Sequence, residues 1–413
     1  MDSTRQKAAG MSPARLRLHR TTRAGAVAAS AALALTLAAC GGSIGASSAS
    51  TGGGKTLTIG FMAPVTGPVA ADGAGIKRGF DLAVKDVNAS GGVLGHPIKV
   101  VFADDQADPA TATQVANKMI TQDHVNMLFG TITGDEALAV AKVADAAKIP
   151  FSAAEMGTMD AACDHYSWVF GETDPMILKP LVPHMIAAHG KRVALVGSDY
   201  NFPHSFNKLA TQLITAAGGT VVDEEYAPLG TSDWQPVANK LAAAKPDWVL
   251  TSVVGGDAVA FMKQADQFGL LKSTPVTGIS LIQDYYPALG TIDDGRELVT
   301  RYTDELPSAA NKKFVEAYRA AYNWHDPIQD VAANAYEGVH FIAKAVNAAG
   351  DTSSDAIIKA LASTTMDGGI FGRGKFSANH RFETPMQLVK IEAGGKYVPV
   401  KDLGVITDPT ECK

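Results

Sequence analysis

The sequence predicts an α/β protein with two doubly wound lobes, each built on a parallel sheet that helices cover on both faces. Three observations lead to this fold class. Short apolar runs alternate with amphipathic helix patterns from Lys55 onward, the order of these elements occurs twice, and each copy has a Gly-Gly pair after its first helix. About 360 residues follow the N-terminal segment, which is more than one ordinary core holds and indicates two domains.

The first copy begins with an apolar strand at residues 57–61. A helix follows in which apolar side chains recur every three or four residues, and Gly91-Gly92 ends it. A second strand is expected at 98–102, and Asp108-Pro109 then supplies the cap and first turn of a second helix, which contains the run VANK. A third strand at 127–129 completes this βαβαβ unit.

The second copy repeats the same elements in the same order. A strand at 193–196 leads into a helix that ends at Gly218-Gly219, and a strand at 220–222 follows. The next helix contains VANK again, here at 237–240, and precedes a strand at 248–251. The matching order indicates a duplication, and parallel strands joined through helices require right-handed crossovers.

Later segments add helices and a hairpin to the two lobes. Helices are expected at 311–322, 331–349 and 355–363, and a hairpin is expected to join strands at 386–391 and 396–398. Open α/β sheets bind ligands outside the carboxyl ends of their strands. Two lobes that face each other therefore form a ligand cleft between those ends.

The N-terminal segment has the features of an export signal. Four arginines at 15–23 directly precede an apolar, Ala-rich run at 24–39, which is shorter than the roughly 20 apolar residues that a membrane-spanning helix needs. The run LAAC at 37–40 resembles the lipobox of bacterial lipoproteins. That resemblance implies a signal peptide at 1–39, lipid on Cys40, and a flexible tether at 40–54 that holds the protein at the outer face of the cytoplasmic membrane or in the periplasm.

Charge and motifs exclude several classes of function. Residues 1–39 carry six Lys or Arg and one Asp, a net +5, so their removal changes the formal charge from −6 to −11. An acidic protein of this kind is not expected to bind nucleic acid. The sequence lacks a Gly-x-x-x-x-Gly-Lys-Ser/Thr loop, so ATP hydrolysis is expected in separate subunits and no cofactor is expected here.

Two cysteines remain after Cys40. Cys163 and Cys412 can form a disulfide in an exported protein or stay as two free thiols, and the sequence leaves both alternatives open. Neither has a second cysteine or a histidine at the spacing of a zinc site, so no metal site is expected.

Several local motifs together resemble the type I periplasmic binding proteins of ATP-driven importers, in particular the leucine/isoleucine/valine-binding group. These motifs are PVTGP at 64–68, GFDLAV at 79–84, NASGGVLG at 88–95 and Asp104-Asp105. GSDYNFP at 197–203 and YAPLG at 226–230 resemble the branch that binds urea and short-chain amides. The resemblance covers nearly all of the chain after Lys55 and implies two lobes joined by a hinge of three segments.

The resemblance also implies the boundaries of the lobes. We expect lobe 1 to comprise 55–172 and 304–368, lobe 2 to comprise 173–303 and 369–403, and a C-terminal tail to follow at 404–413. The hinge segments are then expected near 172–174, 300–302 and Gly368-Gly369.

Carried over residue by residue, the family resemblance implies seven ligand-binding residues. These are Asp72, Thr133, Ala154, Glu155, Tyr200, Asp257 and Ser280. Thr133 is expected at a helix N-terminus, where free N–H groups favour a carboxylate or a carbonyl oxygen. Glu155 and Asp257 are expected to accept N–H bonds from the ligand. Asp72 stands where amino-acid binders usually have an aromatic ring.

The ligand expected from these residues is a small polar solute. The amino-acid branch has a hydroxyl where this chain has Met156, and it has an acid near residues 278–280, where this chain has none. As the expected ligand, urea or a short amide therefore ranks slightly above an amino acid.

The leading function is that of a lipid-anchored binding protein, not an enzyme, which delivers the solute to a membrane permease by hinge closure. An exported hydrolase of the amidase kind and a solute sensor are the alternatives. The hydrolase requires a nucleophile beside a base, and the sequence has no Gly-x-Ser-x-Gly motif around Ser198.

Overall fold

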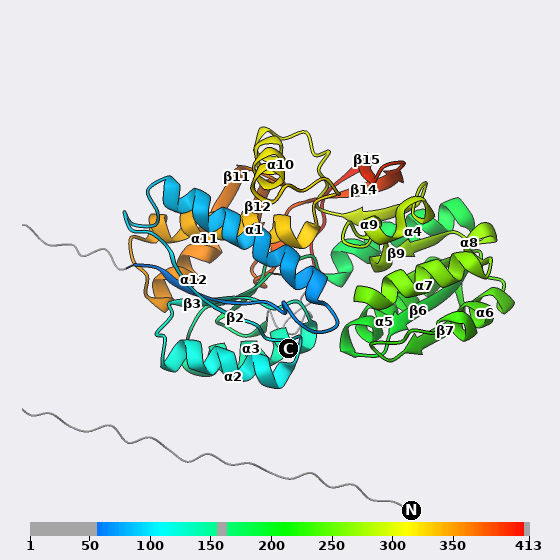
Figure 1. Ribbon diagram of the computed structural model, residues 1–413, viewed down its shortest axis with the longest axis horizontal. Helices are drawn as coiled ribbons and strands as arrows, with labels where there is room; N and C mark the ends of the chain where they lie inside the picture. Colours follow the sequence, from blue (N-terminus) through cyan, green and yellow to red (C-terminus); the bar gives the residue numbers. More distant parts are fainter. Residues whose placement is uncertain (1–55, 155–162, 409–413) are drawn as a thin grey trace, which may run out of the picture. The chain divides into compact units, whose positions relative to one another are not determined.

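The computed structural model describes residues 56–154 and 163–408. The expected signal peptide, the tether with Cys40, Glu155 and Cys412 all lie outside these residues. The described part of the chain holds no helix with the length and apolar character needed to cross a membrane. The predicted α/β class with two parallel-sheet lobes is confirmed (Figure 1).

Lobe 1 is built on a five-stranded parallel sheet with the strand order β2-β1-β3-β4-β5. Its strands are β1 (Thr58–Met62), β2 (Lys99–Ala103), β3 (Met127–Gly130), β4 (Phe151–Ala153) and β5 (Ser167–Val169). The covering helices are α1 (Ala70–Ala89), α2 (Pro109–Thr121), α3 (Gly134–Ala147), α10 (Ala309–Tyr322), α11 (Asp330–Ala349) and α12 (Ser354–Ser363). α1 packs against α11, and α2 packs against α3, so the sheet has a helix pair on each face (Figure 1).

Lobe 2 is built on a four-stranded parallel sheet with the strand order β7-β6-β8-β9. Its strands are β6 (Arg192–Ser198), β7 (Thr220–Ala227), β8 (Trp248–Ser252) and β9 (Val276–Gly278). Its helices are α4 (Asp174–His189), α5 (Asn201–Ala216), α6 (Gln235–Ala243), α7 (Gly255–Gln267), α8 (Leu270–Ser273) and α9 (Tyr286–Leu289), with the short 3-10 turns η2 (Ile279–Leu281) and η3 (Gly290–Ile292). Separate apolar clusters fill the two faces of this sheet.

Two small antiparallel sheets complete the lobes. One has the order β10-β14-β15, with β10 (Glu297–Thr300), β14 (Pro385–Glu392) and β15 (Lys396–Val405). The other has the order β11-β12-β13, with β11 (Thr365–Gly369), β12 (Gly372–Phe376) and β13 (Phe382–Glu383). β14 pairs with β10, so the C-terminal hairpin belongs to lobe 2.

The third crossing between the lobes differs from the expected one at Gly368-Gly369. Phe376 and Phe382 belong to the core of lobe 1, and Phe382 stacks on Phe170 with ring centroids 4.0 Å apart. Residues 369–383 therefore belong to lobe 1, not to lobe 2, and the chain crosses at Thr384. The two glycines lie instead at the turn between β11 and β12, where Gly369 pairs with Gly372.

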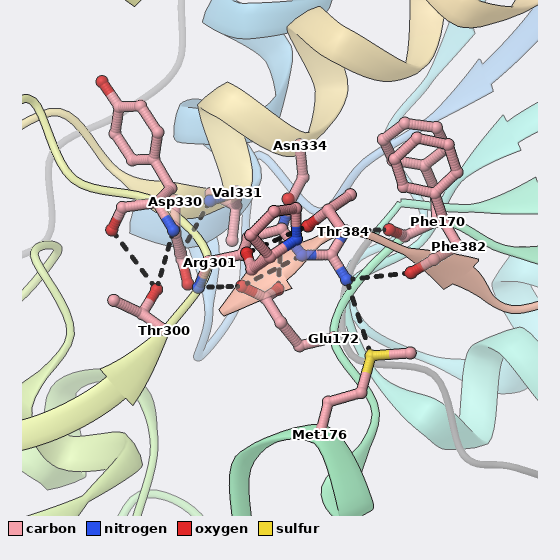
Figure 2. Close-up of polar contacts among 12 residues, drawn as sticks. Phe170, Glu172, Met176, Thr300, Arg301, Asp330, Val331, Asn334, Phe382 and Thr384 are labelled. Carbon is pink, nitrogen blue, oxygen red and sulfur yellow. Dashed lines mark hydrogen bonds and ion pairs between the residues drawn. The ribbon is translucent and has the colours of Figure 1, made fainter. Parts of the chain in front are cut away.

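All three crossings meet at one buried arginine, Arg301, as Figure 2 shows. Its guanidinium donates to the backbone oxygens of Phe170, at the first crossing, and Phe382, just before the third. Its Nε lies 3.4 Å from Glu172 Oε1, and its backbone N–H donates to the same oxygen. Asn334 of α11 donates to the other Glu172 oxygen at 3.1 Å. The hinge is thus held by a charge pair that is out of contact with water.

We expect Arg301→Ala to lower the free energy of unfolding by about 3 to 5 kcal/mol, because it leaves the Glu172 carboxylate buried without its partner. Urea denaturation of the chain from Lys55 to Lys413 measures this loss. Arg373→Ala is the matched control, since Arg373 and its partner Asp367 are both largely exposed; its effect should stay within about 0.5 kcal/mol. A loss below about 1 kcal/mol for Arg301→Ala would show that the hinge does not depend on the pair.

Cys163 is disulfide-bonded, and the other two cysteines of the sequence lie outside the described residues. The last described residue, Asp408, forms a buried ion pair of 3.0 Å with Arg381 of lobe 1. The backbone of Arg381 in turn forms a parallel β-bridge with Val169, which lies six residues after Cys163. The tail therefore returns from lobe 2 to the neighbourhood of Cys163, and we propose that Cys412 is the partner.

The proposed pairing is tested by counting thiols in the chain from Lys55 to Lys413, which lacks Cys40. Under denaturing, non-reducing conditions we expect no free thiol in the wild type and one in Cys412→Ser. Two free thiols in the wild type would contradict the bridge.

Candidate ligand-binding site

Several cavities in the described part of the chain have walls from both lobes, and one of them encloses about 440 Å³ of space free of protein atoms, open solvent included. Its walls in lobe 1 are Val69, Asp72, Ile132, Thr133 and Gly134. Its walls in lobe 2 are Tyr200, Phe202, Val254, Ile279, Ile282 and Tyr285. Most of these residues follow the carboxyl ends of β3, β6, β8 and β9, which is where an open α/β sheet binds its ligand.

The cavity wall in lobe 1 includes the N-terminus of α3. β3 ends at Gly130 with a φ of 126°, and a Cβ there would lie 1.9 Å from the Met62 backbone oxygen, so only glycine permits the turn. Thr133 then caps α3 in a capping box with Glu136. Because Thr133 Oγ1 donates to Glu136 at 2.8 Å, its hydroxyl meets a ligand as an acceptor, while the helix end provides positive potential.

A buried acid pair lies behind this cap. Burial, followed by the charge of Glu136, raises the pKa of Asp105 to about 8. Burial also raises the pKa of Glu136. Asp105 comes directly after β2, so the pair joins this strand end to the helix that carries Thr133. Two carboxyls placed this way share a proton at neutral pH.

Two tyrosines form part of the wall in lobe 2. Tyr285 Oη accepts a hydrogen bond of 2.7 Å from the backbone N–H of Gly255, so its own proton is available to a ligand acceptor. Tyr200 is the N-cap residue of α5, and burial is the main cause that raises its pKa. Both phenols are therefore neutral hydrogen-bonding groups at neutral pH.

Asp72 is the acid in the cavity wall. It lies in the first turn of α1, only 5% of its surface is exposed, and its Oδ1 accepts no hydrogen bond from the described residues. Burial raises the pKa of this carboxyl to about 7. A buried carboxyl oxygen without a donor is costly, and a ligand N–H group would satisfy it.

The structure brings together three of the seven expected residues, namely Asp72, Thr133 and Tyr200. Three others do not line the cavity. Asp257 accepts a hydrogen bond of 2.8 Å from the Gly230 backbone and so holds the loop after β7. Ser280 Oγ donates to the Val253 backbone oxygen at 2.7 Å. Ala154 is buried in the core of lobe 1.

Tyr285 and the apolar residues Ile279 and Ile282 were not among the ligand-binding residues expected from the sequence. All three lie in the connection after β9, for which only Ser280 was proposed. The run of two adjacent aromatics at Tyr285 and Tyr286, after a strand end, was the signal available in the sequence.

A larger open hollow of about 1230 Å³ lies on lobe 2, between α4 and β10, but it takes its lining from that lobe alone. Among residues 56–154 and 163–408, no three His, Cys, Asp or Glu side chains are placed to hold a metal ion. Among the cavities with walls from both lobes, the one at the carboxyl ends of β3, β6, β8 and β9 is the candidate site, because open α/β sheets bind their ligands there.

Comparison with known proteins agrees with this arrangement. A family model described as periplasmic binding protein matches residues 56–396. Leu/Ile/Val-binding protein homolog 7 of Brucella suis biovar 1 (strain 1330) is 26% identical over 371 residues, covering 83% of this chain and 91% of that protein. Leu/Ile/Val-binding protein homolog 8 of the same organism is 27% identical over 394 residues, covering 87% and 94%.

Two solved structures from Rhodopseudomonas are also similar. A solute-binding protein of an ABC transporter from R. palustris BisB5, in complex with 3,4-dihydroxybenzoic acid, has a TM-score of 0.80 at 26% identity and covers 86% of this chain and 99% of its own. Another from R. palustris, in complex with benzoate, has a TM-score of 0.81 at 25% identity and covers 87% and 99%. The chain belongs to the periplasmic binding protein family. Its two parallel-sheet lobes have the type I arrangement.

We expect stability to fall as the pH rises from 5 to 9, because folded Asp105 keeps its proton up to about pH 8 whereas its ordinary value is 3.8. Between these values the folded state binds more protons than the unfolded state, so the free energy of unfolding decreases with pH. Asp105→Asn has no proton to lose and should reduce this decrease by on the order of 2 kcal/mol.

Urea denaturation at a series of pH values checks this expectation, with Asp326→Asn as the control for an exposed acid. An Asp105→Asn profile parallel to that of the wild type would show that the acid pair does not share a proton.

Proposed function

We propose that this chain is the extracytoplasmic substrate-binding component of an ABC importer. It captures a small solute between its lobes and delivers it to a membrane permease, while separate subunits hydrolyse ATP. Family membership supports this role, as do relatives named for leucine, isoleucine and valine binding and for ABC transport. The observation that carries it is the cavity, because each lobe provides about half of its wall.

A ligand in such a cavity controls the closure of the lobes. It contacts Thr133 and Asp72 from one lobe and Tyr200 and Tyr285 from the other, so its binding free energy is complete only when the lobes are closed. A ligand that binds one conformation better shifts the population toward it. The permease then distinguishes loaded from empty protein by the surface that closure creates.

The site favours a solute with an N–H donor and a compact apolar part. Asp72 provides the acceptor, and the N-terminus of α3 and Tyr285 face an oxygen acceptor of the ligand. The apolar side chains of Val69, Phe202, Ile279 and Ile282 surround the remaining space. Short-chain amides and amino acids meet this description better than urea, which has no apolar part to bury.

The N-terminal segment supports a lipid anchor for this protein. The run LAAC places Cys40 where lipoproteins are cleaved and lipidated, and the Gly/Ser-rich segment that follows suits a tether. We propose that the lobes work at the outer face of the cytoplasmic membrane or in the periplasm, within reach of the permease.

The role is tested by thermal unfolding of the chain from Lys55 to Lys413 with acetamide, isobutyramide, leucine, valine, urea and benzoate. A compound that binds only the folded state at 100 times its Kd stabilises it by about 2.7 kcal/mol, so at least one should raise the melting temperature by several degrees. Small-angle scattering should show a smaller radius of gyration with that compound.

Variants of the cavity wall complete the test. Tyr200→Ala should weaken binding by more than about tenfold, since it removes one face of the site. Asp257→Asn should leave the affinity unchanged, because this acid does not line the cavity. An unchanged melting temperature with every compound would count against the role.

A further inference from the structure

Two acids from opposite lobes, Asp72 in the cavity wall and Asp284 next to two wall residues in the sequence, have buried oxygens that accept no hydrogen bond from the described residues. Asp72 belongs to α1 of lobe 1 and lines the cavity. Asp284 belongs to lobe 2, between Ile282 and Tyr285, which both line it. Both carboxyl oxygens of Asp284 are inaccessible to water, and neither has a hydrogen-bond donor in the described part of the chain. Each acid thus has a carboxyl oxygen without the hydrogen bonds that water would donate to it.

The cations nearby do not neutralise these acids. Arg78 is the basic residue that acts on Asp284. Its Nε donates to Tyr318 Oη at 2.6 Å, its Nη2 donates to Gln329 Oε1 at 2.7 Å, and its guanidinium lies over the Trp324 ring. Within residues 56–154 and 163–408 it forms no ion pair with Asp72 or Asp284. A third acid, Asp330, adds its own negative charge to the group.

The electrostatic state of the group follows from burial and like charge. Burial, and after it the charges of Asp72 and Asp330, raise the pKa of Asp284 well above its ordinary value. Tyr285 and Tyr200 lie in the same field, and the charge of Asp72 contributes to raising the pKa of each phenol. The empty site therefore limits the repulsion between its acids by keeping them protonated, and a bound cation favours their charged, deprotonated forms.

We propose that Asp72 and Asp284 form a cation subsite for a positively charged N–H group of the solute, such as an ammonium or an amidinium. Asp72 contacts this group through its unpartnered oxygen. Asp284 adds its charge from the other lobe, so the cation binds most tightly when the lobes close. This inference rests on the proposed function and narrows its solute class to organic cations with an apolar body, which the apolar side chains of the cavity enclose.

The proposal is tested with two sets of probes that share a shape and differ in charge. One set is benzylamine, benzamide and benzoate, and the other is 3-methylbutylamine, 3-methylbutanamide and 3-methylbutanoate. Calorimetry at pH 7.5 with the chain from Lys55 to Lys413 should give each amine an affinity at least about tenfold above its amide and its acid. An amide or an acid that binds more tightly than its amine overturns the subsite but leaves the proposed function standing.

Variants separate the contact from the longer-range charge. Asp72→Asn should lower the affinity for the amines by more than about tenfold and leave the amides within about threefold. Asp284→Asn should have a smaller effect in the same direction, about threefold to tenfold. Asp293→Asn is the matched control, because Asp293 is also buried with unpartnered oxygens in lobe 2 but does not line the cavity. Equal losses in Asp72→Asn and Asp293→Asn would overturn the subsite.

A second measurement tests the subsite in the ligand-free protein if no probe binds. Closure buries both acids and requires them to take up protons, which is unfavourable at pH 8, so Asp284→Asn should raise the closed fraction of the ligand-free protein severalfold. Energy transfer between one dye on each lobe measures this fraction. A closed fraction equal to that of the wild type, together with no binding by any probe, would remove both the subsite and the support for solute binding.

Discussion

The charge pair of Arg301 and Glu172 is the constraint on which the two-lobed arrangement depends. Three chain crossings must pass between the lobes, and buried backbone oxygens at such crossings need donors. Arg301 supplies them at Phe170 and Phe382, and Glu172 keeps the guanidinium neutralised. The fork of Arg suits this task because it presents several donors in a fixed plane, which a lysine cannot do. The three crossings are therefore held together at one buried point.

The binding site also depends on how buried charged groups are neutralised. Asp105 and Glu136 lie behind the cap of α3 in lobe 1, and Asp72 in the cavity wall and Asp284 act on each other by charge. In the first case the acids satisfy each other through a shared proton, and in the second the solute is proposed to satisfy them. Binding free energy and lobe closure then have a common origin, because the same desolvation that strengthens a ligand contact makes the empty closed state unfavourable.

Much of the fold was available from sequence pattern. The two βαβαβ copies, the Gly-Gly pairs after α1 and α5, and the C-terminal hairpin all follow from local periodicity and turn chemistry, and the structure has each of them. The third crossing did not follow, because the assignment of β12 and β13 to lobe 1 depends on where Phe376 and Phe382 find a core. That is a tertiary contact, and no local pattern encodes it.

The site was predicted less completely for a similar reason. The family resemblance implied Asp72, Thr133, Tyr200 and Asp257 alike. Only the packing of the loop at Gly230 shows that the Asp257 carboxyl is already occupied. Likewise the sequence contains many acidic residues, and no local sequence pattern identifies Asp284 as one whose carboxyl group is buried away from water.

The interleaving of the lobes has a consequence for how the chain acquires its structure. The sheet of lobe 1 is covered on one face by α1 and α11, which are separated in the sequence by the part of lobe 2 from α4 to β10. As the chain emerges, the sheet of lobe 2 can form through β9 before α11 has emerged. One apolar face of the lobe 1 sheet stays uncovered until α11 packs on it. Contacts of such sequence separation are slow to form. An exported chain that emerges N-terminus first therefore exposes this half-finished surface for most of its passage, and chaperones of the export route are expected to recognise the N-terminal third.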